Sequence, residues 1–121
     1  MGNELKRLAW IGSARRDLRT FPDEVRREIG YALYEAQLGG KSPSAKPLSG
    51  FGGTGVLEII EDFQANTYRA VYTVKFESTI YVLHTFQKKS KRGIATPKIE
   101  IDLIKRRLKF AEQQYKEGNR G

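Results

Sequence analysis

The stretch NTYRAVYTVKFESTIYVLHTFQKKSKR, residues 66–92, predicts two antiparallel strands that are joined by a tight turn and followed by positive charge. Side chains from Thr67 to Phe76 alternate between two faces with the period of a strand. The second segment, Ile80 to Gln87, is rich in β-branched and aromatic residues, which favour strands. The turn is expected at Glu77-Ser78, so the two segments form a hairpin.

The register of this hairpin follows from its turn. If Phe76 pairs with Thr79, then Arg69 lies opposite Phe86 and His84 lies on the same face as both. A slip of one residue would move His84 to the other face, so the grouping depends on this register.

Positive charge gathers directly after the second strand. The sequence has no acidic residue between His84 and Lys98. An arginine and the chain's only histidine on a sheet face, with lysines where the strand ends, are groups that bind phosphate. We therefore expect a phosphate site that also uses the basic residues after the strand: Lys88, Lys89, Lys91, Arg92 and Lys98.

The size and composition of the chain predict a single domain, residues 1–121, with a core of its own. The chain has no cysteine, which excludes disulfides, zinc–thiolate sites and iron–sulfur clusters. A net charge of +8 favours an anionic partner: nucleic acid, a ribosome, an acidic protein or a membrane surface. Because no apolar run has the length of a signal peptide or a membrane span, we expect a cytoplasmic protein with no membrane partner.

The N-terminal half predicts a strand followed by helices. Residues 5–11 (LKRLAWI) are expected to form the strand, and residues 13–18 a short helix. A longer helix is expected from Pro22 to Gly39-Gly40, because apolar residues recur between them at helical spacing. Residues 41–54 (KSPSAKPLSGFGGT) are predicted to be a loop, and their glycines match no phosphate-binding motif.

The C-terminal half completes an α+β fold. Residues 55–62 predict a strand before the hairpin. Thr96 as N-cap and Pro97 at the first helical position predict the start of a C-terminal helix, whose apolar stripe would pack on the sheet. The expected order is an N-terminal strand and helices, a three-strand antiparallel meander and a C-terminal helix.

Four segments in this order resemble the RelE/ParE toxin superfamily, over roughly residues 48–111. They are a strand that ends in an acid, YRAVY (68–72), IYVLHTFQKKS (80–90) and TPKIEIDLIKRRL (96–108). The pattern is most similar to the HigB-like, phage-derived toxins of bacterial type II toxin–antitoxin systems. The resemblance implies a compact RelE-like domain, in many members an mRNA endonuclease that acts on the translating ribosome. It also implies a cognate antitoxin, often a helix-turn-helix protein.

The resemblance also implies roles for single residues. The positions that match family motifs are Arg69 of the YRAVY strand, Phe86, Lys88 and Lys89 of the F.KK segment, Thr96-Pro97, and Arg107 of the last helix. Two departures stand out. Ile60 occupies a position where many relatives have an arginine, and Arg92 to Ala95 lengthen the loop before Thr96.

The residue types at this site suit RNA cleavage without a metal ion or other cofactor. The RNA 2′-hydroxyl can attack the adjacent phosphorus, so the site must accept a proton, stabilise the charged transition state and protonate the leaving oxygen. We expect catalysis by Arg69, His84, Lys88 and Lys89. We expect RNA or phosphate binding by Lys91, Arg92, Lys98, Phe86 and Arg107.

Structural readings of the same residues remain open. His84 in an apolar strand is also typical of a hydrogen-bonded structural histidine, and an ion pair with Glu58 across the sheet is the structural alternative for Arg69. For the lysines, the alternative is a solvated charged run. A magnesium site of Glu58, Glu61 and Asp62 is the weaker interpretation, because acids after a strand more often mark a solvated end.

Three functions are consistent with the sequence. The first is an mRNA interferase that is neutralised by an antitoxin. The alternative is a ParE-type toxin without nuclease activity that inhibits DNA gyrase. The third is a module with the toxin fold that only binds nucleic acid or its antitoxin. Fold alone does not separate them.

Overall fold

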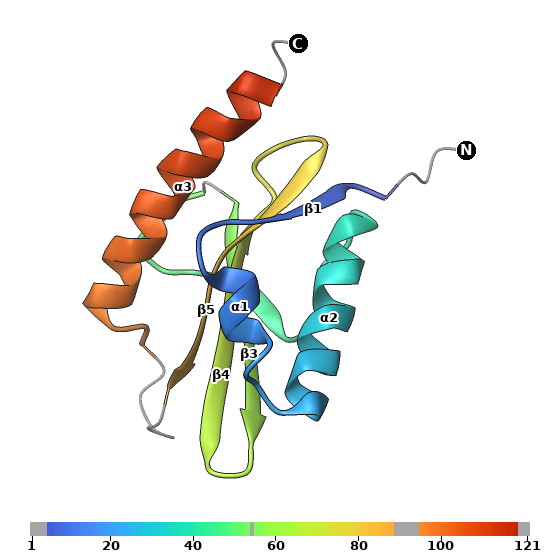
Figure 1. Cartoon of the computed structure of the whole chain (residues 1–121), viewed down its shortest axis with the longest axis vertical. Coiled ribbons are helices and arrows are strands. Elements are labelled where there is room, and N and C mark those ends of the chain that lie inside the picture. The colour runs from blue at the N-terminus through green and yellow to red at the C-terminus, as the bar shows by residue number, and fades with distance from the viewer. Residues whose placement is uncertain (1–4, 54, 89–94, 119–121) are drawn as a thin grey trace.

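A computed structural model describes residues 5–53, 55–88 and 95–118 of the chain (Figure 1). Three of the predicted site residues, Lys89, Lys91 and Arg92, lie outside the described residues. The elements in chain order are β1 (Arg7–Trp10), α1 (Ala14–Leu18), α2 (Asp23–Gln37), β2 (Ala45–Pro47), β3 (Val56–Phe63), β4 (Asn66–Thr73), β5 (Thr79–Lys88) and α3 (Lys98–Gly118).

The strands form one five-stranded sheet in the order β1-β5-β4-β3-β2. The predicted meander of β3, β4 and β5 is antiparallel and forms its centre, which confirms the α+β class. β1 joins β5 in parallel at one edge. β2 pairs with β3 at the other edge, inside the segment that was predicted to be a loop. This strand has only three residues and ends in a proline, so it carries no readable alternation.

The hairpin has the predicted register where the site residues lie. Arg69 pairs with Phe86, and Val71 pairs with His84. The register then shifts by one residue, because Tyr72 pairs with Val82 and Leu83 is left without a partner. This β-bulge places Leu83 and His84 together on the face that α3 covers, and bulges of this kind often lie beside functional sites.

The face of the sheet under α1 and α2 is an apolar core. Ile29 and Leu33 of α2 are almost fully buried against the sheet, whose side chains Ile59 and Tyr72 point toward them. Burial of side chains of this size stabilises a fold by about 1.5–3 kcal/mol each. The core on this face therefore depends on the α2 stripe that the helical spacing predicted.

The opposite face is covered by α3, which runs alongside β5 (Figure 1). Ile104, Leu108 and Ala111 of α3 pack against Val71 and neighbouring apolar side chains of the sheet. Toward the start of α3 the buried side chains become polar. This end of the α3 face is where the predicted site residues lie.

The start of α3 differs from its prediction by one position. The carbonyl oxygen of Pro97 accepts the first helical hydrogen bonds, from Glu100 and Ile101. Pro97 is thus the N-cap residue and Lys98 the first helical residue, so the assignment of Thr96 as N-cap is wrong. Thr96 contributes its hydroxyl to a buried side chain of the sheet instead. In the described part of the chain, no helix has the length and apolarity that crossing a membrane requires.

Candidate active site under the first turn of α3

The α3 face of the sheet brings together Arg69 from β4 with His84 and Phe86 from β5. Adjacent strands place Arg69 beside Phe86, and the bulge turns His84 toward α3. The rings of His84 and Phe86 stack with centroids 4.8 Å apart. The predicted grouping on one face is present. Two carboxylates complete it: Glu58, whose pairing with Arg69 the sequence left open, and Glu100, which the sequence analysis did not assign to the site.

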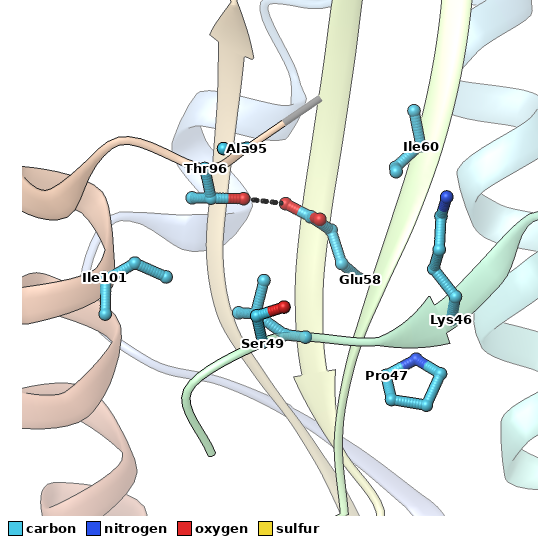
Figure 2. Close-up of a pocket in the computed structure, with 9 residues that line it drawn as sticks. Lys46, Pro47, Ser49, Glu58, Ile60, Ala95, Thr96 and Ile101 are labelled. Atoms are coloured by element: carbon cyan, nitrogen blue, oxygen red, sulfur yellow. Dashed lines mark hydrogen bonds between the residues drawn. The ribbon is translucent and has the colours of Figure 1, made fainter. Parts of the chain in front are cut away.

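The guanidinium of Arg69 is buried and lies beside a carboxylate. Its side chain is 3% exposed and that of Glu58 is 6% exposed, and Nη1 lies 3.3 Å from Oε2 of Glu58. Thr96 accepts a hydrogen bond from Nη1 of Arg69 (3.1 Å) and donates one to Oε2 of Glu58 (2.7 Å; Figure 2). The hydroxyl therefore ties the loop before α3 to the buried ion pair.

His84 is hydrogen-bonded through both ring nitrogens. Its Nε2 lies 2.6 Å from Oε1 of Glu100, and its Nδ1 lies 3.4 Å from Nη1 of Arg107. Since a carboxylate only accepts and a guanidinium only donates, Nε2 carries the proton and Nδ1 accepts. Burial lowers the pKa of His84 below its ordinary value; Glu100 opposes this shift and Arg107 adds to it. His84 is therefore neutral at pH 7.

Arg107 connects α3 to the start of α1. Its Nη1 donates to the carbonyl oxygen of Leu83 (2.9 Å) and its Nη2 to the hydroxyl of Ser13 (3.1 Å). The Ser13 hydroxyl donates to Asp17 at 2.8 Å, so one chain of polar contacts runs from Glu100 through His84 and Arg107 to Asp17. Burial lowers the pKa of Arg107, and Asp17 partly offsets the shift.

A glycine makes room for this arginine. Gly12 has a φ of +56°, and a Cβ at this position would lie 2.9 Å from Cζ of Arg107. The backbone before α1 therefore needs glycine both for its conformation and for its contact with the guanidinium.

Two of the predicted lysines lie at the edge of the site. Nζ of Lys88 donates to the carbonyl oxygen of Ala95 at 2.7 Å, across the segment that joins β5 to α3. Lys98 is highly exposed, and its Nζ lies 3.2 Å from Asp102 one turn further along α3. Both cations are close to the first turn of α3.

A pocket of about 310 Å³ adjoins the Arg69–Glu58 pair. It lies between the β2–β3 edge of the sheet and the start of α3 (Figure 2). Its lining combines apolar walls with a few polar groups, the composition typical of small ligand sites. The residues are Lys46, Pro47, Leu48, Ser49, Glu58, Ile60, Ala95, Thr96 and Ile101.

The acids proposed for magnesium do not converge. Glu58 bonds Arg69 and Thr96, and Asp62 accepts a hydrogen bond from Thr67. Glu61 alternates to the opposite face of β3, where burial raises its pKa. No group of three His, Cys, Asp or Glu residues in the described part of the chain is arranged to hold a metal ion.

The sequence analysis missed the residues that position the cations. Glu100 falls inside the TPKIE segment, and its position three residues after Pro97 places it on the first turn of the helix. That spacing was readable, but the side chain's direction toward His84 was not. Gly12, Ser13 and Asp17 lie more than 60 residues from His84 and Arg107, so no local pattern relates them to the site.

The family of the chain is shown by its sequence. A family model described as phage-derived protein Gp49-like matches residues 16–109. Since the match spans well over half of the 121 residues, the chain belongs to the Gp49-like family. A search of curated proteins finds no match.

Three solved structures are similar to this chain in fold. The isolated E. coli RelE toxin is 20% identical with a TM-score of 0.54, over 84% of this chain and 97% of that chain. A mutant of E. coli toxin RelE in the free state is 22% identical with a TM-score of 0.51, over 67% of this chain and 81% of that chain. A chain in the toxin–antitoxin complex RelBE2 from Mycobacterium tuberculosis is 19% identical with a TM-score of 0.49, over 69% and 99%.

The E. coli matches show that the fold is RelE-like. A RelE-like fold, in a member of a family of phage-derived proteins, is what the resemblance of the hairpin motifs predicted. The finer assignment to the HigB-like branch stays a prediction.

Proposed function

We propose that this protein is the toxin of a type II toxin–antitoxin system and cuts mRNA on the translating ribosome without a metal ion. The observation that carries the proposal is the convergence of Arg69, His84 and Arg107 on one sheet face, with Lys88 and Lys98 at its edge. A cluster of this kind offers the phosphate contacts and the proton acceptor that cleavage by the RNA's own 2′-hydroxyl requires.

The cations of the site bind and stabilise the phosphate. Lys88 and Lys98 meet the RNA backbone at the edge of the site. RNA binding by Lys89, Lys91 and Arg92, which lie outside the described residues, stays a prediction from the sequence. Arg69 then exchanges part of its contact with Glu58 for a phosphate oxygen, which a guanidinium can bind in a bidentate manner. Phe86, stacked on His84, supplies an aromatic face for a base if the first turn of α3 moves.

The His84–Glu100 pair handles the proton. Both nitrogens of His84 are engaged, and the Glu100 side chain is 28% exposed. The 2′-hydroxyl proton therefore passes either to Glu100, with His84 supporting the carboxylate, or to Nδ1 after the long bond from Arg107 opens. The 2′-oxygen then bonds to phosphorus while the bond to the 5′-oxygen breaks, and the group that took up the proton, Glu100 or His84, returns it to the leaving 5′-oxygen. Arg107 stabilises the charge that develops at phosphorus.

Expression in a bacterium from a controlled promoter tests this proposal. Wild-type protein is expected to arrest growth and to leave cut transcripts, which sequencing of RNA ends detects. The variant Lys88→Ala/Lys98→Ala is expected to lose most of the cleavage. The matched control Lys109→Ala/Lys116→Ala removes two exposed lysines further along α3 and is expected to remain toxic.

Other outcomes would contradict the proposal in different ways. Equal cleavage by both double variants would place the site elsewhere. Growth arrest with intact transcripts and inhibited DNA supercoiling would identify a gyrase toxin. Growth that is indifferent to expression would leave only a binding module with the toxin fold.

The proposal includes a cognate antitoxin and action in the cytoplasm. A protein that cuts its own cell's transcripts must be neutralised there, and a net charge of +8 favours a partner that covers the basic surface with acidic groups. We expect a small helix-turn-helix protein to form a stable complex with the chain and restore growth when co-expressed. Failure of the product of an adjacent reading frame to do either would contradict this pairing.

A further inference from the structure

The pocket beside the Arg69–Glu58 pair contains a polar atom to which none of the described residues donates a hydrogen bond. Both hydrogen bonds to the Glu58 carboxylate, from Arg69 and Thr96, end on Oε2. Oε1 has no hydrogen-bond partner among the residues that the structure describes, although the Glu58 side chain is only 6% exposed. A carboxylate oxygen in such a place gains free energy from a ligand that donates N–H groups.

The rest of the pocket restricts what that ligand is. Apolar walls come from Pro47, Leu48, Ile60 and Ile101, so a flat apolar ring is accommodated between them. Lys46 is an exposed residue of the pocket lining, and Lys98 follows two residues after the lining residue Thr96. Their positive charges disfavour a cationic ligand and attract an anionic chain. The volume of about 310 Å³ is at the small end of the range for ligand sites.

We propose that this pocket is a nucleobase recess that binds one base of the RNA and reads its amine edge through Oε1 of Glu58. The inference rests on the proposed function, because the chain that carries the base is the RNA whose phosphate lies at Arg69. Oε2 of Glu58 bonds Arg69, so the same carboxylate contacts the base through Oε1 and orients the arginine that binds the phosphate. Adenine, cytosine and guanine present an exocyclic amine to Oε1, whereas uracil has none.

A binding experiment tests the recess separately from cleavage. Fluorescence anisotropy with the tetranucleotides rA4, rC4 and rU4 is expected to show rA4 and rC4 bound about 5- to 150-fold more tightly than rU4, the discrimination typical of one good polar contact to a base edge. The variant Ile60→Phe fills the recess and leaves Glu58 and Arg69 in place, so it is expected to bind all three with similar affinity.

Controls separate the recess from changes in folding. Tyr31→Trp adds bulk at an exposed position of α2 and is expected to keep the preference. If circular dichroism shows that Ile60→Phe is unfolded, Ser49→Trp is used in its place. Ser49 is an exposed residue of the pocket lining, so a tryptophan there covers the recess without a change in the core.

The outcomes distinguish this inference from the proposed nuclease activity. Equal binding of the three tetranucleotides by wild-type protein, or an unchanged preference in the filled variants, would overturn the recess. A base preference without any RNA cleavage would support the recess and reject the nuclease. Loss of antitoxin binding in the filled variants with base preference unchanged would assign the pocket to a protein partner and overturn the inference.

Discussion

The two faces of the sheet are built from different chemistry. Under α1 and α2 the buried side chains form one apolar core, in which Ile29, Leu33 and Ile59 are representative. Under the start of α3 the same sheet buries an arginine and a histidine against carboxylates. Burying an ion pair seldom stabilises a fold more than apolar side chains of the same size would. The α2 face therefore supplies stability, whereas the start of the α3 face buries charged and polar side chains that stability alone does not require.

The largest expected effect comes from removing one partner of the buried pair. Glu58→Met leaves Arg69 as an uncompensated buried charge, which we expect to lower the free energy of unfolding by about 3–5 kcal/mol. The double variant Glu58→Met/Arg69→Met replaces both charges with apolar side chains, and we expect it to be about as stable as wild type but unable to cut RNA. Urea unfolding and a cleavage assay measure the two effects.

These two variants test whether the buried ion pair of the α3 face contributes to stability. If the double variant were as unstable as the single one, the ion pair would be a stabilising part of the fold. If it were stable and still cut RNA, Arg69 would have no part in phosphate binding.

The next largest effect compares two glycines. Gly12 contacts Arg107 of α3, and Gly30 lies in α2. Gly12→Ala forces a left-handed conformation on alanine and places its Cβ against Arg107, so we expect a loss of about 1–2 kcal/mol and of most cleavage activity. Gly30→Ala, in α2, meets no atom within 4 Å and is expected to stabilise the protein by about 1 kcal/mol with normal activity. Thermal unfolding of the two variants measures both changes. Equal stability would show that Arg107 has room to move.

The smallest effect concerns the pH dependence of stability. Burial lowers the pKa of His84 in the folded state, so the unfolded chain binds its proton first as the pH falls. The His84 contribution to stability is therefore complete above the unfolded pKa of about 6.5 and declines as the pH falls below it. Melting temperatures between pH 7.5 and 5.5 are expected to fall more for wild type than for His84→Gln. Parallel profiles would mean that Glu100 compensates the burial fully.

Local sequence patterns predicted the central hairpin well. Alternation and β-branched residues predicted β4 and β5, and the position of the turn predicted the pairing of Arg69 with Phe86. Nearer the turn, the bulge shifts the register by one residue. The period of the apolar residues likewise predicted α2 and α3. These features depend on neighbours in the chain, which is why they were accessible without coordinates.

The parts that were missed depend on contacts between distant segments. The edge strand β2 forms because β3 offers unpaired backbone groups to it, and its own three residues carry no signal. The start of α3 shifted because the Thr96 hydroxyl bonds Glu58 in preference to the helix end. The link from Arg107 to Ser13 joins positions 94 residues apart.

By itself, the sequence determined the long helices, the central strands, the pairing of Arg69 with Phe86 and the excess of positive charge, because each is a property of residue order and composition. The pairing of Arg69 with Glu58 was one of two alternatives that the sequence left open, and the tertiary structure decided between them. Only the tertiary structure showed that Glu100 bonds His84 and that a pocket opens beside Glu58. Those outcomes depend on which helix covers which face of the sheet. A buried carboxylate or cation costs free energy unless it is paired, so these groups bond to partners that are distant in the chain.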